Sequence, residues 1–436
     1  MLKRLATWMK AEDVPASRLP WRIFWVALAV RLLYMTLAHL WRVRPYDDHF
    51  SFAWEAGRIA RSLVEGYGYS SPFRGHTGPT AWLPPLYPLL VAGVFKVTGI
   101  YTPLSAWILL AVSCVFNALA ALAVWEIGRR VFSRANAVYA AWLWALYPAA
   151  MQYAVKWLWE MSITTCFFAW SIVLALRLAR INNSETVSEE SDTLNPTLGW
   201  MAFGVLWGLI ALSNSSLLLF LPAAGLWILS RTWQRPHSVR DAALAGLLFL
   251  AAVAPWEARN YAVFHKFIPF RGNLGAEAAL GNGPGARGFL MEYNHPEQAT
   301  DQWNLYAEMG EVRYAAMRGK LASDTIHADP ARFAANVFKR FCFFWNGVPS
   351  DNRWATELPR LINFGFLSYT GLLGLALALH RRVPGAWLFL WAFVLLPIPY
   401  YLVTVHARFR HPLEPIIAVL GVFLFQSAER RKKAQV

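Results

Sequence analysis

The sequence predicts an all-α polytopic membrane protein with about ten transmembrane helices, additional interfacial helices and a small α-rich segment on the outer face. Of the 436 residues, 57% are hydrophobic and only 15% are charged, whereas a soluble domain carries about 25% charged residues. Apolar stretches of about 20 residues recur along the chain, the length that spans a bilayer. This composition excludes a disordered chain, a disulfide scaffold and an ordinary cytosolic enzyme.

The first apolar run, residues 23–41, follows a basic N-terminus, and no small-residue cleavage site follows it, which predicts an uncleaved signal anchor. The shorter run 83–97 contains Pro84, Pro85 and Pro88, so we expect an interfacial helix there instead of a span. We expect nine further spans, at residues 104–128, 134–148, 160–179, 197–213, 216–231, 241–257, 361–380, 385–403 and 413–427.

These spans divide the chain into an N-terminal transmembrane module (1–257), an outer segment (258–360) and C-terminal transmembrane helices (361–436). With both termini cytoplasmic, the short cytoplasmic loops carry an excess of Lys and Arg, as the positive-inside rule requires. The net charge is +15, and most of the remaining basic residues lie in the outer segments 42–82 and 258–360. This distribution favours an anionic partner at the outer surface, such as a lipid phosphate, although anionic outer-leaflet headgroups would also account for it.

The first outer loop contains three carboxylates within nine residues, Asp47, Asp48 and Glu55. The sequence from Phe52 onward predicts an amphipathic interfacial helix. A partly desolvated carboxylate at this surface can act as a general base on an incoming hydroxyl or amine. The alternative is structural, with the aspartates in a solvated loop or N-cap and Glu55 paired with Arg58, or else with Arg22 or Arg42.

A second outer acid, Glu160, lies at the mouth of the fourth expected span, one turn after Lys156. It could bind a divalent metal together with Asp48. The alternative is an i,i+4 ion pair between Lys156 and Glu160 inside an aromatic belt.

Three later outer segments carry recognisable patterns. Residues 262–270 resemble a short strand, and they lead to the glycine-rich loop 281–285, whose exposed backbone could approach a sugar or phosphate. Asp329 and Pro330 predict the start of an amphipathic interfacial helix that runs to residue 345.

The outer loop 405–415 contains two arginines and two histidines within six residues, His406, Arg408, Arg410 and His411. Because Arg makes bidentate contacts with phosphate oxygens, this cluster is a candidate phosphate-binding site. Ion pairing with Glu414 and snorkelling to lipid headgroups are the alternatives.

Several short motifs occur in a characteristic order on the outer side: Gly57–Leu63, Glu65–Gly68, Pro84–Leu90, Arg259–Phe264 and Arg408–Pro412. Together they resemble the C-type (GT-C fold) membrane glycosyltransferases, in particular the bacterial branch similar to dolichyl-phosphate-mannose protein mannosyltransferases and the lipid A aminoarabinose transferase. The family usually has an Asp-Glu pair in the first outer loop. Here Asp47, Asp48 and Glu55 share that region, so the base is not assigned to one of them.

The resemblance implies an inverting enzyme that transfers a sugar from a polyprenyl-phosphate carrier to a lipid, glycan or protein acceptor, at the outer face of the bacterial cytoplasmic (inner) membrane. The expected partners are this carrier, an envelope acceptor and membrane lipids, without nucleic acid; no cofactor is certain, and a divalent metal is possible. The outer segment 258–360 would recognise the acceptor. The catalytic candidates are Asp48, Glu55, Asp47 and Glu160. The candidates for substrate and phosphate binding are Arg58, Arg61, His76, Lys156, Arg259, Asn260, Arg271, Asn282, His406, Arg408 and Arg410.

Two other classes remain open at the level of sequence. A transporter or flippase of lipid-linked or anionic solutes would place ionisable residues near the membrane midplane and often shows inverted repeats. Here Arg31 is the charged residue that stands out within an expected span, and the two halves of the chain show no symmetry. A polymerase or ligase of lipid-linked glycans would use similar basic outer loops without needing the acidic first loop.

Overall fold

The computed structural model describes residues 18–43, 51–182, 194–289, 294–348 and 354–434. Across these residues the secondary structure is helical, apart from one isolated antiparallel bridge between Ser70 and Pro79. Eight segments are long and apolar enough to cross a membrane, which confirms an all-α multi-pass membrane protein. They are α2 (Leu19–Leu37), α5 (Pro103–Val131), α8 (Met161–Leu178), α9 (Pro196–Ser213), η2 with α10 (Ser215–Leu219 and Phe220–Thr232), α11 (Ser238–Phe264), the Leu361–His380 part of α16 (Trp354–His380), and η4 with α19 (Ala407–Leu413 and Glu414–Ala434).

Two of the ten expected spans are shorter than predicted, and proline is the reason in both cases. The run 134–148 ends as α6 (Arg134–Leu146), because Pro148 begins the separate helix α7 (Pro148–Val155). The 13 residues of α6 reach about 20 Å, less than the ~30 Å hydrocarbon core. The run 385–403 divides near Pro397 into α17 (Ala386–Leu395) and α18 (Ile398–Leu402). The proline-rich run 83–97 forms the short apolar helix α4 (Leu86–Thr98).

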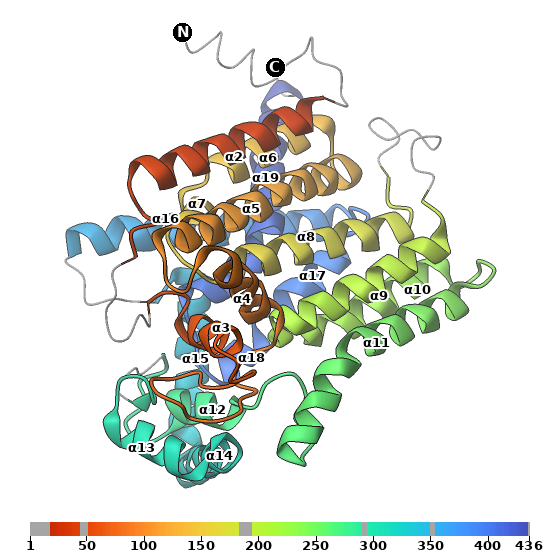
Figure 1. Cartoon of the computed structure of the whole chain (residues 1–436). Coiled ribbons are helices and arrows are strands. Elements are labelled where there is room, and N and C mark those ends of the chain that lie inside the picture. Colours follow the sequence, from red (N-terminus) through yellow and green to blue (C-terminus); the bar gives the residue numbers. More distant parts are fainter. Residues whose placement is uncertain (1–17, 44–50, 183–193, 290–293, 349–353, 435–436) are drawn as a thin grey trace.

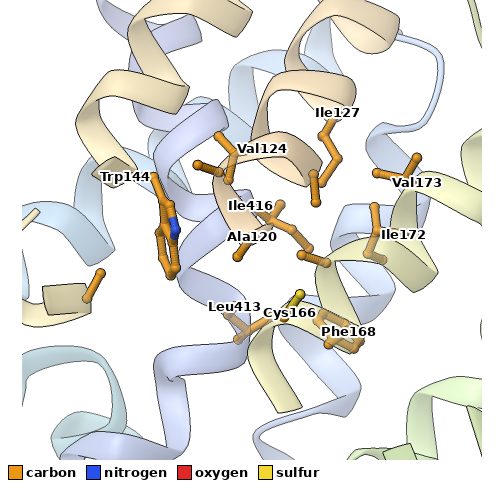
Figure 2. Close-up of a cluster of buried hydrophobic side chains, with 14 of the residues drawn as sticks. Ala120, Val124, Ile127, Trp144, Cys166, Phe168, Ile172, Val173, Leu413 and Ile416 are labelled. Atoms are coloured by element: carbon orange, nitrogen blue, oxygen red, sulfur yellow. The ribbon is translucent and has the colours of Figure 1, made fainter. Parts of the chain in front are cut away.

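Helix α5 lies at the centre of the bundle and contacts α2, α6, α8 and α19 (Figure 1). Small residues such as Ala120 on α5 allow close approach of these helices, as in other membrane bundles. Figure 2 shows the resulting core, in which side chains from α5, α6, α8, η4 and α19 meet. The labelled residues are Ala120, Val124, Ile127, Trp144, Cys166, Phe168, Ile172, Val173, Leu413 and Ile416.

Arg31, the charged residue of the first span, is fully buried and caps the end of α6. Its guanidinium donates hydrogen bonds to the carbonyls of Trp144 (3.2 Å) and Ala145 (2.7 Å), and its Nε donates to Asn117 Oδ1 (3.0 Å). Pro148 lacks the N–H that would otherwise bond the Trp144 carbonyl. Arg31 therefore satisfies backbone groups inside the membrane where water cannot reach them.

The outer segment is helical, as expected, and consists of α12 (Leu274–Asn282), α13 (Thr300–Met309), α14 (Glu311–Ala328) and α15 (Pro330–Asn346). In Figure 1 these helices gather at the lower end of the bundle, below the amphipathic helix α3 (Trp54–Val64). The predicted start of α15 is confirmed, because the Asp329 side chain accepts a hydrogen bond from the Arg332 N–H (2.9 Å). The strand expected at 262–270 is wrong, since α11 continues to Phe264 and a turn follows.

Candidate active site

Helix α3 holds Glu55 in a fixed position at its first turn. The two residues before Glu55, Ala53 and Trp54, have left-handed φ angles of 68° and 50°. A Cβ atom at Gly57 would lie 1.9 Å from the Phe52 carbonyl oxygen, so only glycine allows the preceding loop to fold back over this turn. The backbone around Glu55 is thus built to a tight geometry.

The Glu55 carboxyl is largely buried, and burial raises its pKa above the ordinary glutamate value, although Arg408, Arg271 and Arg58 oppose the shift. His295 Nε2 lies 3.5 Å from Glu55 Oε1. Because His295 Nδ1 accepts a hydrogen bond from the Glu297 N–H (3.2 Å), the ring proton is on Nε2 and faces the carboxyl. Glu55 is therefore an acid with a raised pKa among cationic side chains, a combination typical of catalytic sites.

A stack of three indole rings lies beside Glu55. The Trp157 and Trp159 rings are parallel, with centroids 4.8 Å apart, and Trp54 packs 4.6 Å from Trp159. The Arg408 guanidinium lies over the Trp159 ring, 4.2 Å from its centroid, as a cation–π pair. This stack connects helix α3, the segment 156–160 between α7 and α8, and η4.

Arg408 is a predicted phosphate ligand that lies at the indole stack. In the described part of the chain, no carboxylate lies within ion-pair distance of it, and its buried Nε has no hydrogen-bond partner. Its charge acts on Glu55. An arginine that is partly desolvated and lacks a carboxylate partner is well suited to bind a phosphate group.

Arg271 also faces this region. Its Nε donates a long hydrogen bond to the Trp82 carbonyl (3.4 Å), and its Nη2 lies 4.0 Å from Glu277. Its charge acts on Glu55 as well as on the phenol of Tyr69. Arg271 and Arg408 thus supply positive charge to the same carboxyl from different segments of the chain.

Glu160 and Lys156 lie next to the indole stack. Lys156 Nζ sits 5.0 Å from the centroid of the Trp157 ring and forms no ion pair with Glu160, so the alternative of an i,i+4 pair is wrong. The Glu160 charge acts on the phenols of Tyr87 and Tyr400. The Tyr87 hydroxyl is buried, and no hydrogen-bond partner is found for it within the described ranges.

Other predicted residues are engaged in contacts within the fold. Arg58 is buried and pairs with Glu297 (3.0 Å), Arg61 lies 3.9 Å from Glu65, and the His76 ring packs against Tyr67. His406 Nδ1 accepts a hydrogen bond from the Arg408 N–H (3.3 Å) and so begins η4. Asn282 donates to the carbonyls of Leu402 and Val403.

Arg259 and Asn260 hold the first outer loop against α11. The Arg259 guanidinium donates to the carbonyls of Thr80 (2.6 Å) and Tyr69 (2.7 Å). Asn260 accepts from Arg259 (3.0 Å) and donates to the Ile268 carbonyl (3.3 Å). These bonds give both side chains a structural task, and phosphate binding by them stays a prediction.

Arg410 is fully buried and lies outside the region around Glu55. It donates to Glu414 Oε1 (3.0 Å) and to the Phe364 carbonyl (2.8 Å). His411 Nδ1 lies 2.7 Å from the other Glu414 oxygen. The alternative of ion pairing with Glu414 is therefore confirmed for Arg410, whereas phosphate binding by Arg408 stays a prediction.

Asp47 and Asp48 lie outside the described residues, so their position relative to Glu55 stays a prediction. Among the residues that are described, no group of three or more His, Cys, Asp or Glu side chains could hold a metal ion. The predicted metal site included Asp48 together with Glu160, and that pairing is likewise untested. His295 and Glu297 were not predicted from the sequence, because no spacing relates them to helix α3.

Comparisons with protein-family models and with curated proteins find no match. Among solved structures, an oligosaccharyltransferase of Archaeoglobus fulgidus in the apo form matches with a TM-score of 0.53 and 13% identity, over 96% of this chain and 52% of that chain. The oligosaccharyltransferase AglB from Archaeoglobus fulgidus, in complex with an inhibitory peptide and a dolichol-phosphate, matches with a TM-score of 0.51 and 13% identity, over 96% and 52%. ArnT from Cupriavidus metallidurans bound to undecaprenyl phosphate matches with a TM-score of 0.41 and 14% identity, over 92% and 77%.

The likeness to AglB shows that the fold is that of the C-type membrane glycosyltransferases, as the sequence motifs predicted. The chain spans about half the length of the AglB chain. At 13% identity the likeness concerns the fold.

Proposed function

We propose that this protein is a membrane glycosyltransferase that moves a sugar from a polyprenyl-phosphate carrier to an envelope acceptor. The observation that carries the proposal is that Glu55, an acid with a raised pKa, and Arg408, a guanidinium that pairs with no carboxylate of the described residues, lie beside one indole stack. Group transfer from a phosphate carrier needs both a base for the acceptor and a cation for the leaving group. The likeness to AglB, which has been solved with a dolichol-phosphate, supports a carrier of this class.

In the proposed mechanism, ionised Glu55 removes a proton from the acceptor hydroxyl or amine. The acceptor atom then attacks the anomeric carbon, and the bond between this carbon and the phosphate oxygen breaks with inversion of configuration. The electron pair leaves with the polyprenyl phosphate, whose charge is stabilised by Arg408 and Arg271. Asp48 and Asp47 are the alternative bases in the same loop.

We place this chemistry at the outer face of the bacterial cytoplasmic membrane, with both termini in the cytoplasm. The basic residues of the short loops support this orientation. The site lies where the first outer loop meets the outer segment, and we propose that residues 258–360 receive the acceptor.

The test is a transfer assay with the protein reconstituted in lipid vesicles. The donors are undecaprenyl phosphate linked to glucose, mannose or aminoarabinose, and the acceptors are envelope lipids; release of undecaprenyl phosphate is measured. We expect Glu55→Gln to lower the rate by about 10²- to 10⁴-fold, the usual contribution of a general base. Glu65→Gln, which changes an exposed acid just after the same helix, should keep the wild-type rate.

Two outcomes would contradict parts of the proposal. If Asp48→Asn abolishes transfer while Glu55→Gln does not, the base is Asp48 and the role of Glu55 is wrong. Movement of the lipid-linked sugar across the vesicle membrane without cleavage of the sugar–phosphate bond would instead identify a transporter.

A further inference from the structure

The side chains of Arg340 and Asn282 form hydrogen bonds with the backbone turn that precedes Arg408. Arg340 on α15 is fully buried, and its Nη1 donates to the carbonyls of Tyr401 (3.0 Å) and Leu402 (3.2 Å). Its Nη2 donates to Asn282 Oδ1 (2.8 Å) and to the Gly281 carbonyl. Asn282 Nδ2 donates in turn to the Leu402 carbonyl (3.0 Å), so the last carbonyls of α18 are held from two sides.

Gly281 brings α12 unusually close to this turn. A Cβ atom at Gly281 would lie 1.8 Å from the Val403 carbonyl oxygen, a distance that no side chain tolerates. The glycine-rich loop was expected to approach a ligand through its backbone, whereas in the described structure Gly281 approaches the chain itself. This contact leaves the turn little freedom to shift relative to α12.

The chain runs directly from this turn to the cation of the site. Thr404 and Val405 are buried, and His406 then accepts the Arg408 N–H that begins η4. The guanidinium of Arg408 ends over the Trp159 ring. Arg408 is therefore fixed at its side chain by the indole stack, while the backbone that leads to it is fixed by α12 and α15.

We propose that Arg340 and Asn282 are positioning residues that set Arg408 for binding of the carrier phosphate. This proposal rests on the proposed function, because it assigns the phosphate to Arg408. Neither residue needs to touch the carrier, since the Arg340 Nη atoms and the Asn282 amide are already committed to carbonyl and amide groups of the chain. The outer segment thereby influences how Arg408 binds the leaving phosphate, through the backbone turn that precedes Arg408.

The test is a double-mutant cycle on binding of undecaprenyl phosphate to the full-length protein in detergent micelles. Arg408→Ala should weaken binding about 10- to 100-fold, the effect of losing a charge-assisted hydrogen bond. Asn282→Ala should weaken it roughly 3- to 10-fold in the wild-type background and should have no further effect in the Arg408→Ala background. A residue with a merely structural role would weaken binding equally in both backgrounds.

Two further variants separate positioning from a loss of folding. Asn282→Asp keeps an oxygen for Arg340 but loses the donor to the Leu402 and Val403 carbonyls, so it should weaken binding as Asn282→Ala does. Asn336→Ala removes another buried amide of α15 and should leave affinity unchanged. If Asn282→Ala weakens undecaprenyl phosphate binding equally in both backgrounds, or not at all in the wild-type background, the positioning role alone is overturned. If Arg408→Ala leaves the affinity unchanged, the proposed contact between Arg408 and the phosphate is overturned as well.

Discussion

Arg408 and Arg410 lie two residues apart on the same short helix, yet the fold gives them opposite environments. Arg408 is partly exposed and stacks on Trp159, and no carboxylate of the described chain pairs with it. Arg410 has no exposed surface and binds Glu414, which is equally buried and also contacts His411. One short helix thus carries a partly exposed cation and a cation of the core.

The difference follows from what each environment requires of a charge. A guanidinium inside the membrane bundle has to be neutralised and hydrogen-bonded, because burial without a partner costs several kcal/mol. A guanidinium at the edge of the bundle keeps contact with water and can remain unpaired until an anion arrives. Arg410 therefore contributes to the stability of the protein, whereas Arg408 is the cation that we propose binds the carrier phosphate.

The largest effect that we expect from the difference between Arg408 and Arg410 is on the free energy of unfolding. Arg410→Ala leaves the Glu414 carboxylate buried with His411 as its remaining contact, and it should lower the free energy of unfolding by about 3–5 kcal/mol. Thermal denaturation in detergent measures the loss. Arg408→Ala removes a cation–π contact and should cost about 1 kcal/mol or less. Similar losses of unfolding free energy in Arg410→Ala and Arg408→Ala would contradict the different environments assigned to the two arginines.

Much of the fold could be predicted from the sequence, because helix length and apolar composition are local properties. The amphipathic helix α3, the capped start of α15 and eight of the ten spans followed from such patterns. The breaks at Pro148 and Pro397 were also visible as residues. Their effect was not predicted, because a proline can kink a spanning helix or end it.

The site was less predictable, because its contacts join distant parts of the chain. Arg58 and Glu297 are 239 residues apart, and neither periodicity nor a motif relates them. Likewise, nothing in the sequence around Arg259 indicates that it binds the carbonyls of Tyr69 and Thr80. The residue types identified the candidate cations. Only the fold shows which of them bind groups of the protein itself and which can contact a ligand.

The second effect is on the pH dependence of transfer. Since burial raises the pKa of Glu55 and a general base has to be ionised, transfer should rise with pH, with a midpoint above the ordinary glutamate value of 4.5. Below this midpoint the rate should fall about tenfold per pH unit. Initial rates across pH 4 to 9, at saturating donor, measure the midpoint.

The same pH profile distinguishes the effect of Arg408 on Glu55 from that of Arg61. The Arg408 charge favours ionised Glu55, so Arg408→Ala should move the midpoint to higher pH in addition to lowering the rate. Arg61 shares helix α3 with Glu55 but lies beside Glu65 (3.9 Å), so Arg61→Ala should move the midpoint less than Arg408→Ala does. A midpoint that is the same in wild type and Arg408→Ala would place Arg408 too far from Glu55 for the proposed site.

The smallest effect concerns a buried acid, Glu311, that forms no ion pair with the cations of the described residues. Glu311, at the start of α14, accepts hydrogen bonds from Thr80 Oγ1, from the Ala81 N–H (2.8 Å) and from the Tyr306 hydroxyl (3.0 Å). Burial raises its pKa in the folded protein. Its contribution to stability is therefore fully present below pH 4.5 and is lost as pH rises through the folded-state pKa.

Glu311→Gln removes this titration while keeping the size of the side chain. We expect the difference in thermal denaturation midpoint between wild type and the variant to shift in favour of the variant as pH rises from 4 to 8. Glu414 differs in that Arg410 and His411 lie in contact with its carboxylate. If the difference in denaturation midpoint between wild type and Glu311→Gln stays constant with pH, the three neutral donors stabilise ionised Glu311 as well as water does. A buried acid in this protein would then not need the cations that contact Glu414.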